Sequence, residues 1–388
     1  MSPVDVTALG AAGDGAADDA PAIQSALDAG GWVYVPPGTY RLASILRGPA
    51  AGRLRLTLAP GATLLRDHDE GIIFTSTPAG GSAGGYGGPG DILIEGGTWD
   101  VAGVAHPAYA GAIAVAHGAG ITIRDAAFLD VPGWHAIEIN GCRTVRVRDC
   151  RFAGFAHTGD RGYSEAIQVD AMTSTGVYPW GGPYDGTPCD DVEISGCWVG
   201  ASGTPGTQAW PRGVGSHNVN ADHHTRIRVV GNAMDGVTDC GIQAVRWAQS
   251  RISGNQVAGS GGEGIAVRTG SLHVDVDGNQ VADSGRSGIW LNDNVSQISV
   301  RDNTVIGSGR AEHATHFGIR GSNSATWLLI TGNRVRRRSS GNHAAYGLSL
   351  TSTCGGVMRY GNDLRYGGVL GGIDDNSSSP TTSAGDAT

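Results

Sequence analysis

The sequence predicts an all-β solenoid in which short parallel strands stack as coils of about 24 residues, preceded by a short N-terminal helix. The first observation is a repeated phrase in which an apolar, strand-like run is followed by an asparagine or a cysteine. The second is a Gly-Ile-x-Φ-x run, where Φ is apolar, that recurs between those phrases. Fixed-period similarity with units of strand length is typical of stacked β-coils. The asparagine or cysteine position is occupied by Cys150, Cys197, Asn232, Asn255, Asn279, Asn303, Asn333 and Asn362.

The composition narrows the function classes. The chain has 388 residues with 65 glycines, and glycine suits the turns that a coiled chain needs repeatedly. The formal net charge of −9 argues against nucleic acid or an anionic membrane surface as partner. No apolar run reaches the roughly 18 residues of a membrane span, and Met1–Gly10 lacks a signal-peptide pattern. The chain contains no lysine, which excludes Schiff-base chemistry on an internal lysine.

Residues 1–45 are expected to cap the solenoid. Asp19 is placed as N-cap and Pro21 in the first turn, and apolar residues at 23, 26 and 27 complete a short amphipathic helix. Such a helix would cover the solenoid's open end, which otherwise exposes core and strand edges. Residues 46–371 then form the solenoid itself. The Asp-, Ser- and Thr-rich segment 372–388 is expected to be a disordered tail.

The N-terminal residues carry a resemblance to a known group. The Asp-Gly-x-x-Asp-Asp stretch at 14–19, the short helix, and the Val-Pro-Pro-Gly-Thr-Tyr turn at 35–40 resemble the entry of right-handed parallel β-helix proteins. That superfamily includes pectate lyases, polygalacturonases and phage tailspike depolymerases. The coil repeat extends the resemblance to about residue 370. It implies a single-stranded right-handed parallel β-helix with a polysaccharide or oligosaccharide partner, but the fold also carries hydrolases, lyases, epimerases and plain binders.

The six cysteines are too few to frame the fold with disulfides. Cys142 and Cys150 recur, identically spaced, as Cys189 and Cys197 one coil later. Neighbouring parallel strands lie about 4.8 Å apart, which is within reach of a disulfide. We favour two stacks of buried thiols, and a Cys150–Cys197 disulfide remains the alternative. A zinc site is not expected because the chain has no C-x-x-C pair.

Alignment of the Gly-Ile-x-Φ-x runs gives columns, because side chains of a strand alternate between its two faces. The inward column is aliphatic throughout, which supports the register: Ile113, Ile137, Ile167, Val214, Ile242, Ile265, Ile289, Ile319 and Leu348. The first outward column reads Ala114, Glu138, Gln168, Gly215, Gln243, Ala266, Trp290 and Arg320. The second outward column reads Ala116, Asn140, Asp170, His217, Val245, Arg268, Asn292 and Ser322. Acids, a histidine, an arginine and a tryptophan thus gather mid-solenoid, which predicts a functional groove there.

The order of these groups is similar to that in polygalacturonases. Glu138 falls where that family has the acid of an Asn-Thr-Asp coil, and Asp170 falls at its double-Asp coil. Gly215-Ser216-His217 falls at the Gly-His-Gly coil, and residues 243–246 fall at the Arg-Ile-Lys coil. None of the four motifs is literal, and the lysine is absent. The departures put galacturonate specificity in doubt and leave carbohydrate chemistry on this face as the expectation.

The first hypothesis is an inverting glycoside hydrolase. Asp170 would be the general acid, Glu138 would activate water, and His217 would orient Asp170 or hydrogen-bond the sugar. Their columns place Glu138 and Asp170 about 8 Å apart between Cα atoms, inside the roughly 6.5–9.5 Å range of inverting carboxyl pairs. Glu165 could replace Glu138, or could be a turn residue. The expected substrate-binding residues are Gln168, Glu165, Gln243, Arg246, Arg268, Trp180, Trp290 and Tyr178.

Two loops interrupt the coils: residues 173–188, with Tyr178, Trp180 and Tyr184, and residues 200–211, with Trp210. Long loops on a rigid scaffold often carry function. Their aromatic rings suit stacking on sugars, with Trp180 and Trp290 as platforms. The alternative is that the loop aromatics pack on the flank of the solenoid.

Two other functions remain open. A polysaccharide lyase acting on a uronate polymer would use Arg268 and His217, with Ca²⁺ or arginine neutralising the carboxylate; Asp222-His223-His224 is expected to be a solvated turn. A non-catalytic carbohydrate-binding or tailspike module would need the tryptophans but no paired acids. The hydrolase needs no cofactor and no metal. An extracellular location is expected, and the oligomeric state is open, with a trimer expected for a tailspike.

Overall fold

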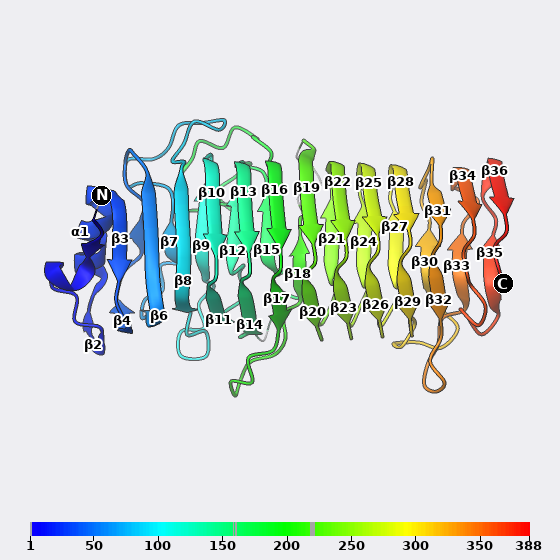
Figure 1. Ribbon diagram of the computed structural model, residues 1–388, viewed down its shortest axis with the longest axis horizontal. Helices are drawn as coiled ribbons and strands as arrows, with labels where there is room; N and C mark the ends of the chain where they lie inside the picture. Colours follow the sequence, from blue (N-terminus) through cyan, green and yellow to red (C-terminus); the bar gives the residue numbers. More distant parts are fainter. Residues whose placement is uncertain (1, 158, 160, 218–221) are drawn as a thin grey trace. The chain divides into compact units, whose positions relative to one another are not determined.

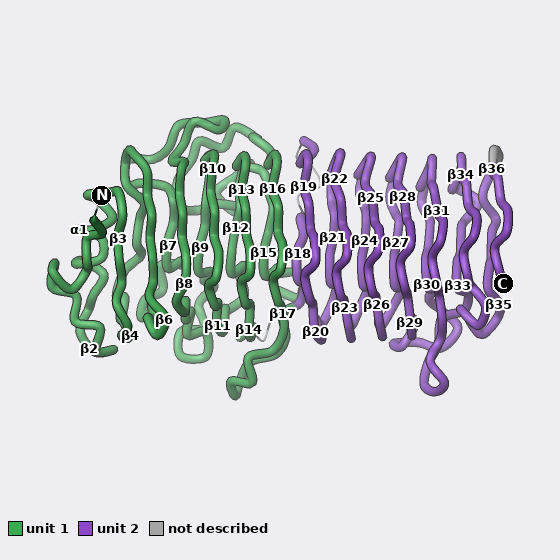
Figure 2. The backbone as a smooth tube through the Cα atoms, in the orientation of Figure 1, with its two compact units in different colours: residues 1–210 green, residues 211–388 purple. Residues whose placement is uncertain are grey.

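The chain forms two compact units, each built from parallel strands stacked coil upon coil. The computed structural model describes residues 2–157, 159, 161–217 and 222–388. The units are Met1–Trp210 and Pro211–Thr388, coloured green and purple in Figure 2. In the described part of the chain, the helical elements are the 3-10 helix Val6–Leu9 and helix α1 (Ala20–Ala29), and the rest of the regular structure is β-strand. The all-β solenoid expected from the repeat is therefore confirmed within each unit (Figure 1).

The strands of the first unit form three parallel series, which we call its first, second and third sides. The first side contains β1 (Val4–Asp5), β3 (Gly31–Val35), β6 (Leu54–Arg66), β8 (Ile92–Asp100), β10 (Ala119–Arg124), β13 (Arg143–Arg148) and β16 (Asp190–Ser195). The second side contains β2 (Asp14–Asp18), β4 (Gly38–Leu42), the far ends of β6 and β8, β11 (Ala127–Val131), β14 (Arg151–Phe155) and β17 (Trp198–Gly200). The third side contains β5 (Leu46–Arg47), β7 (Ile72–Thr75), β9 (Gly111–Ala116), β12 (Ile137–Asn140) and β15 (Glu165–Asp170).

The second unit has the same three sides. Its first side contains β19 (His224–Val230), β22 (Trp247–Ser253), β25 (Leu272–Asp277), β28 (Ser296–Arg301), β31 (Leu329–Thr331), β34 (Gly355–Tyr360) and β36 (Ser378–Ala384). Its second side contains β20 (Ala233–Asp235), β23 (Gln256–Ala258), β26 (Gln280–Ala282), β29 (Thr304–Ile306) and β32 (Arg334–Arg336). Its third side contains β18 (Arg212–Gly215), β21 (Ile242–Val245), β24 (Ile265–Arg268), β27 (Ile289–Asn292), β30 (Phe317–Gly321), β33 (Tyr346–Leu350) and β35 (Gly371–Asp375).

The aliphatic column fills the core as its alternation predicts. In the first unit Ile137 pairs with Ile113 on one side and Ile167 on the other. In the second unit the column runs through Ile242, Ile265, Ile289, Ile319 and Leu348. These side chains are completely buried. Because a slip of one residue would turn each strand over, the buried column fixes which residues face outward.

A ladder of asparagines holds the turns of the second unit. Asn279 Oδ1 accepts hydrogen bonds from both the backbone N–H and Nδ2 of Asn255, each at 3.0 Å. Asn279 Nδ2 in turn donates to Asn303 Oδ1 and to the carbonyl of Ile252, each at 2.9 Å. The residue before the asparagine has positive φ, as at Gly278 (64°), and this bend turns the side chain into the coil. The repeated asparagine is therefore explained by buried turn amides that must be satisfied.

Cysteines take this place in the first unit. All six cysteines of the chain are buried free thiols, including Cys150 and Cys197, so the thiol interpretation is confirmed and the disulfide alternative is not. Burial raises the pKa of Cys142 to about 12 and also raises the pKa of Cys189. A thiol kept protonated in this way is a poor nucleophile, so these cysteines are packing groups.

Helix α1 lies where the sequence places it, at the N-terminal end of the first unit (Figure 1). Its apolar face, with Ile23 and Leu27 fully buried, contacts the 3-10 helix and strands β3, β4 and β5. Asp19 is the N-cap residue, but its side chain does not cap the helix. Its carboxylate instead accepts from the backbone N–H groups of Ala12 (2.6 Å) and Gly13 (3.2 Å), which ties the preceding loop to the helix.

The expectation of a disordered tail at 372–388 is wrong. Strand β35 pairs with β33, and β36 pairs with β34. Asp386 then takes the position of the next ladder residue, because its Oδ1 accepts from the N–H (2.9 Å) and Nδ2 (2.8 Å) of Asn362. Arg359 binds both Asp375 and Asp386. An isolated segment with this polar composition would be unfolded. Residues 372–388 are ordered because they pair with the strands and side chains of the preceding coil.

Candidate functional site

The outward columns of the first unit lie on its third side as expected. Glu138 pairs with Gln168 and Ala114, and Asn140 pairs with Asp170 and Ala116. We call Glu138, Asn140, Gln168 and Asp170 the covered polar row, because their exposed fractions are 1%, 0%, 2% and 0%. The sequence predicted their register correctly but not their burial.

Several hydrogen bonds of the covered polar row are made with neighbouring protein groups. Glu138 Oε2 accepts from Trp134 Nε1 at 2.7 Å. Asp170 accepts from Gln168 Nε2 at 3.1 Å and from the N–H of Ala171 at 2.8 Å. The amide of Asn140 is buried without a hydrogen-bond partner among the described residues. The predicted acid and base are thus brought together on neighbouring strands, but in this arrangement they do not reach a polymer at the surface.

The loop at 173–188 packs on the third side beside this row. Tyr178 is fully buried, and its hydroxyl lies 2.5 Å from Thr75 Oγ1 and 2.9 Å from Thr77 Oγ1. Trp180 is 9% exposed and packs with Tyr178 at 5.2 Å between ring centroids. These two rings cluster with Ala114, Ala116, Ile72 and Met172. Tyr178 and Trp180 therefore pack on the flank of the solenoid, which was the alternative interpretation, and neither ring offers an open face to a sugar. Trp210, from the second loop, is also fully buried.

Glu165 is neither a surface residue nor a simple turn residue. It begins strand β15, is fully buried, and lies 3.5 Å from Nδ1 of the buried His135. The same nitrogen lies 3.1 Å from the N–H of Glu165. This pairing ties two successive coils of the first unit and places Glu165 beneath the surface.

The third side of the second unit carries several partly exposed side chains. On strands β24, β27 and β30, Arg268, Trp290 and Arg320 point outward and are partly exposed. The Arg268 guanidinium lies 5.0 Å from the Trp290 ring centroid, and that of Arg320 lies 4.8 Å from the Phe317 centroid. We call Arg268, Trp290, Phe317 and Arg320 the arginine–aromatic face. Of the predicted substrate-binding residues, Arg268 and Trp290 are therefore brought together.

The hydrogen bonds of the two arginines of this face are incomplete, and the Nε atom of each is buried. Arg268 Nη1 donates to Gln243 Oε1 at 3.3 Å, but the Nε atoms of Arg268 and Arg320 have no acceptor among the described residues. Trp290 is held by its Nε1, which donates to Ser322 Oγ at 3.0 Å, and Ser322 donates to Asn292 at 2.9 Å. A fixed tryptophan beside two incompletely bonded guanidiniums is suited to a ligand with ring faces and anionic groups.

Two carboxylates beside this face were missed by the sequence reasoning. Asp239 and Glu263 precede strands β21 and β24 on successive coils, which are joined by a 2.7 Å hydrogen bond from Gly262 N–H to the Asp239 carbonyl. Asp239 bonds Arg212 at 2.7 Å, and Glu263 lies 3.8 Å from Arg286. Burial raises the pKa of Glu263, assisted by the charge of Asp239 and opposed by Arg286 and Arg268. Both carboxylates sit at the corner before the strand, outside the aligned columns, so column reading could not find them.

The remaining predicted residues lie in the second unit. Gln243 is 4% exposed and donates from Nε2 to the Ser216 carbonyl at 3.2 Å. His217 and Arg246 are partly exposed, and Arg246 follows β21 with a left-handed backbone (φ 59°). His224, expected in a solvated turn, instead begins β19 and is fully buried. Among the described residues no group of three or more His, Cys, Asp or Glu converges to hold a metal.

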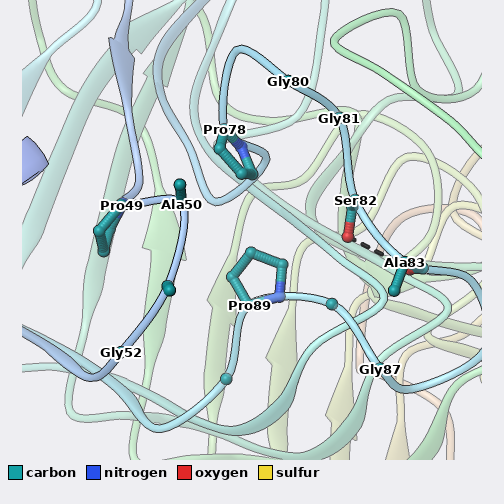
Figure 3. Close-up of a pocket in the computed structure, with 13 residues that line it drawn as sticks. Pro49, Ala50, Gly52, Pro78, Gly80, Gly81, Ser82, Ala83, Gly87 and Pro89 are labelled. Carbon is teal, nitrogen blue, oxygen red and sulfur yellow. Dashed lines mark hydrogen bonds between the residues drawn. The ribbon is translucent and has the colours of Figure 1, made fainter.

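The first unit also has a groove of about 390 Å³ between loops at 49–52, 78–83 and 87–90. Figure 3 shows that its walls are glycine, proline and alanine, apart from Ser82, whose hydroxyl donates to the Ala83 carbonyl at 3.2 Å. The described lining therefore offers backbone groups for binding but no acid, base or nucleophile other than one hydroxyl. No helix of the described chain has the length and apolar character to cross a membrane.

The stacked parallel coils, the buried aliphatic column and the asparagine ladder define the class: the chain is a right-handed parallel β-helix protein. Two family models match it. "Rhamnogalacturonase A/epimerase, pectate lyase-like" matches residues 4–50, and "Right handed beta helix region" matches residues 191–364.

Known proteins share the sequence in part and the fold throughout. Plasmin and fibronectin-binding protein A of Streptococcus pneumoniae is 29% identical over 275 residues, which are 64% of this chain and 38% of that protein. The chain thus spans well under half the length of this curated relative. The crystal structure of this surface adhesin, PfbA, matches with a TM-score of 0.69 and 20% identity over 99% of this chain and 89% of that one.

Two other solved structures are similar. The A-module of the Azotobacter vinelandii mannuronan C-5 epimerase AlgE6 has a TM-score of 0.67 and 16% identity, covering 98% of each chain. The Dettilon tailspike protein has a TM-score of 0.71 and 15% identity, covering 96% of this chain and 68% of that one. At these identities the structural matches establish the fold, which is found in adhesins, tailspikes and carbohydrate-active enzymes alike.

Proposed function

We propose that the chain is an extracellular or surface protein that binds an acidic polysaccharide along the arginine–aromatic face. The observation that carries this proposal is the pair of partly exposed arginines whose guanidiniums lie against the rings of Trp290 and Phe317. Arginine presents a planar fork that matches a carboxylate or sulfate. Aromatic rings bind the apolar faces of sugars and hold the guanidiniums by cation–π attraction.

The spacing of the face favours a polymer over a single sugar. Arg268 and Arg320 lie on β24 and β30, with β27 between them. Two strand spacings amount to about 10 Å, so one monosaccharide does not engage both cations. An extended oligosaccharide with repeated anionic groups does. The chain as a whole carries a formal net charge of −9, so this face with two arginines differs in sign from the chain's net charge.

The comparisons support the class of partner. The similar proteins include a surface adhesin, a mannuronan epimerase module and a phage tailspike. A surface location and a glycan partner are the features we carry over to this chain. The trimer expected for a tailspike, and the calcium ion expected for a lyase, stay predictions.

The test is a binding panel of neutral, uronic and sulfated polysaccharides. The wild type should bind the acidic members, and Arg268→Gln combined with Arg320→Gln should weaken binding by at least about tenfold, because two charge-assisted contacts are lost. Arg251→Gln, on the first side of the same unit, is the matched control and should bind normally. Equal binding of neutral and acidic polymers by the wild type would contradict the proposal.

Glycoside hydrolysis is the second candidate, and the observation in its favour is the Asp239–Glu263 pair. An acid whose pKa is raised beside a second carboxylate is the arrangement that glycosidases use for general acid and base. Glu263 would donate the proton and Asp239 would activate water, next to the arginine–aromatic face. The Glu138–Asp170 pair of the original hypothesis remains the alternative location, provided that its covering loop opens.

Product analysis separates these possibilities. Reducing ends without ultraviolet absorbance from unsaturated sugars would indicate hydrolysis, and both signals together would indicate a lyase. Loss of activity in Glu263→Gln but not in Asp170→Asn would assign the second-unit pair, and the opposite result would assign the covered polar row. Binding without products from any polymer would leave the binding function alone.

A further inference from the structure

Two loops of the first unit meet over its third side. One loop, residues 76–91, joins β7 to β8, and the other, residues 171–189, joins β15 to β16. They run side by side in Figure 1, and hydrogen bonds connect them. Asp185 Oδ2 accepts from the N–H of Gly85 at 2.7 Å, and the Tyr86 hydroxyl donates to the Pro188 carbonyl at 3.0 Å.

His117 lies beneath both loops, directly after β9, and is fully buried. Its Nδ1 is 2.8 Å from the Gly85 carbonyl, and its Nε2 is 2.7 Å from the Pro183 carbonyl. A carbonyl oxygen accepts hydrogen bonds and cannot donate them, so each ring nitrogen needs its own hydrogen to make both bonds. A neutral imidazole has a single N–H. Both hydrogen bonds can therefore form together only in the imidazolium, with one N–H for each loop.

Asp185 and Tyr86, which lie near His117, keep their own protonation states when the ring of His117 gains or loses a proton. Burial raises the pKa of Asp185, but hydrogen bonds from Thr187 and Gly85, together with the charge of His117, outweigh it and lower that pKa overall. Burial raises the pKa of the Tyr86 phenol. The pKa of Asp185 is lowered and that of Tyr86 is raised, so Asp185 stays ionised and Tyr86 stays neutral around neutral pH. The charged or titratable groups that act on Tyr86 are Asp190, Cys189, Arg143 and Cys142, and the charge of His117 acts on Asp185.

We propose that protonated His117 latches the two loops as a lid over the covered polar row, and that loss of its second ring proton releases the lid. One of the two carbonyls, Gly85 or Pro183, then loses its donor. A lifted lid exposes Glu138 and Asp170, and also Asn140, whose buried amide has no partner among the described residues. The site opened in this way suits a polar, hydrogen-bonding ligand such as a sugar. This inference stands apart from the proposed function of the second unit.

The test is hydrogen exchange of loop peptides 76–91 and 171–189 at about pH 5.5 and pH 8, corrected for the intrinsic exchange rate. Protection of both loops should fall by about tenfold or more at the higher pH, the size expected for losing one charge-assisted hydrogen bond. His117→Gln should show weak protection and no pH dependence, and His273→Gln, an exposed histidine of the second unit, should behave as wild type. Unchanged wild-type protection, or a pH response that persists in His117→Gln, would overturn the proposal.

Carboxyl labelling gives a readout that needs no variant. Carbodiimide coupling of Glu138 and Asp170, measured relative to Asp125, which is 56% exposed, should rise with pH as the lid opens. Labelling that stays flat while the loops lose protection would show that the loops do not form the lid over this row.

Discussion

The two units stack their coils in the same way but differ at the turns and on the outer face. The second unit uses asparagines that bond one another from coil to coil, and Arg268, Trp290 and Arg320 on its third side are partly exposed. The first unit places the thiols of Cys150 and Cys197 at the equivalent turns, and the loop with Tyr178 and Trp180 covers its third side. Regular repeats therefore coincide with an accessible surface, and inserted loops coincide with buried carboxylates. The comparison teaches that the repeat sets the scaffold and the departures from it decide which side chains meet solvent.

The sharpest way to break this comparison is to remove one ladder rung. Asn279→Ala removes the side-chain acceptor of the N–H and Nδ2 of Asn255 and the side-chain donor to the carbonyl of Ile252. Oδ1 of Asn303 loses one of its two donors and keeps the backbone N–H of residue 279. Each buried unsatisfied group costs about 1–3 kcal/mol, so we expect the free energy of unfolding to fall by about 4 kcal/mol in total. Cys150→Ala, the first-unit counterpart, should cost about 1 kcal/mol because it removes mainly a small apolar contact. Denaturant unfolding of both variants is the measurement, and equal losses would show that the two kinds of turn are equivalent.

Acid should affect the second unit more than the first. Burial lowers the pKa of His224, in the second unit, to about 3, and that of His68, in the first unit, to about 4. An unfolded histidine titrates near 6.5, so below that pH the unfolded chain binds protons that the folded chain excludes. The free energy of unfolding then falls with pH, reaching a loss of about 3 kcal/mol per histidine near pH 4. The His224 contribution continues to grow down to about pH 3, after that of His68 has levelled off near pH 4.

The measurement is urea unfolding from pH 7 to pH 3.5, with hydrogen exchange to assign the loss to each unit. His224→Phe should remove its share of the pH dependence, and His273→Gln should leave the curve unchanged, because His273 is exposed in the folded chain. A wild-type stability that is flat between pH 7 and pH 4 would contradict the buried, uncharged state of His224.

A smaller effect is expected at the C-terminal coil. Asp386→Ala removes the acceptor for the N–H and Nδ2 of Asn362 and one partner of Arg359. Because this coil is partly solvated, we expect a loss of about 2 kcal/mol, confined to β35 and β36. Faster hydrogen exchange in these strands alone would agree. Asp386→Asn keeps the acceptor oxygen and should lose less, and equal exchange in the two variants would assign the whole effect to the charge.

The sequence predicts the scaffold well because alternation and spacing follow directly from strand geometry. The inward column and both outward columns, from Ala114 to Arg320, have the predicted register within each unit. The same reasoning could not foresee that Tyr178 and Trp180 fold back onto Ala114 and Ala116, since alternation gives the face of a strand and not what covers it. Asp239 and Glu263 were missed because corner residues do not belong to any column.

The tail shows a different reason for failure. Residues 372–388 have the composition of a disordered segment, and composition describes a chain in isolation. Strands β33 and β34 supply hydrogen-bond partners for the backbone of β35 and β36, and amino-acid composition contains no information about such neighbours.

The asparagine ladder has a direction. In every pair, N–H and Nδ2 point toward the following coil and Oδ1 points toward the preceding one, as at Asn303 and Asn333. Aligned amide dipoles polarise one another and leave positive partial charge at the donor end of the row. Asp386 sits at that end, so the row terminates on an anion, as helices favour anions at their N-termini. The carboxylate of Asp386 can accept hydrogen bonds but cannot donate one to a further coil. An aspartate in the asparagine column therefore ends the row of side-chain hydrogen bonds.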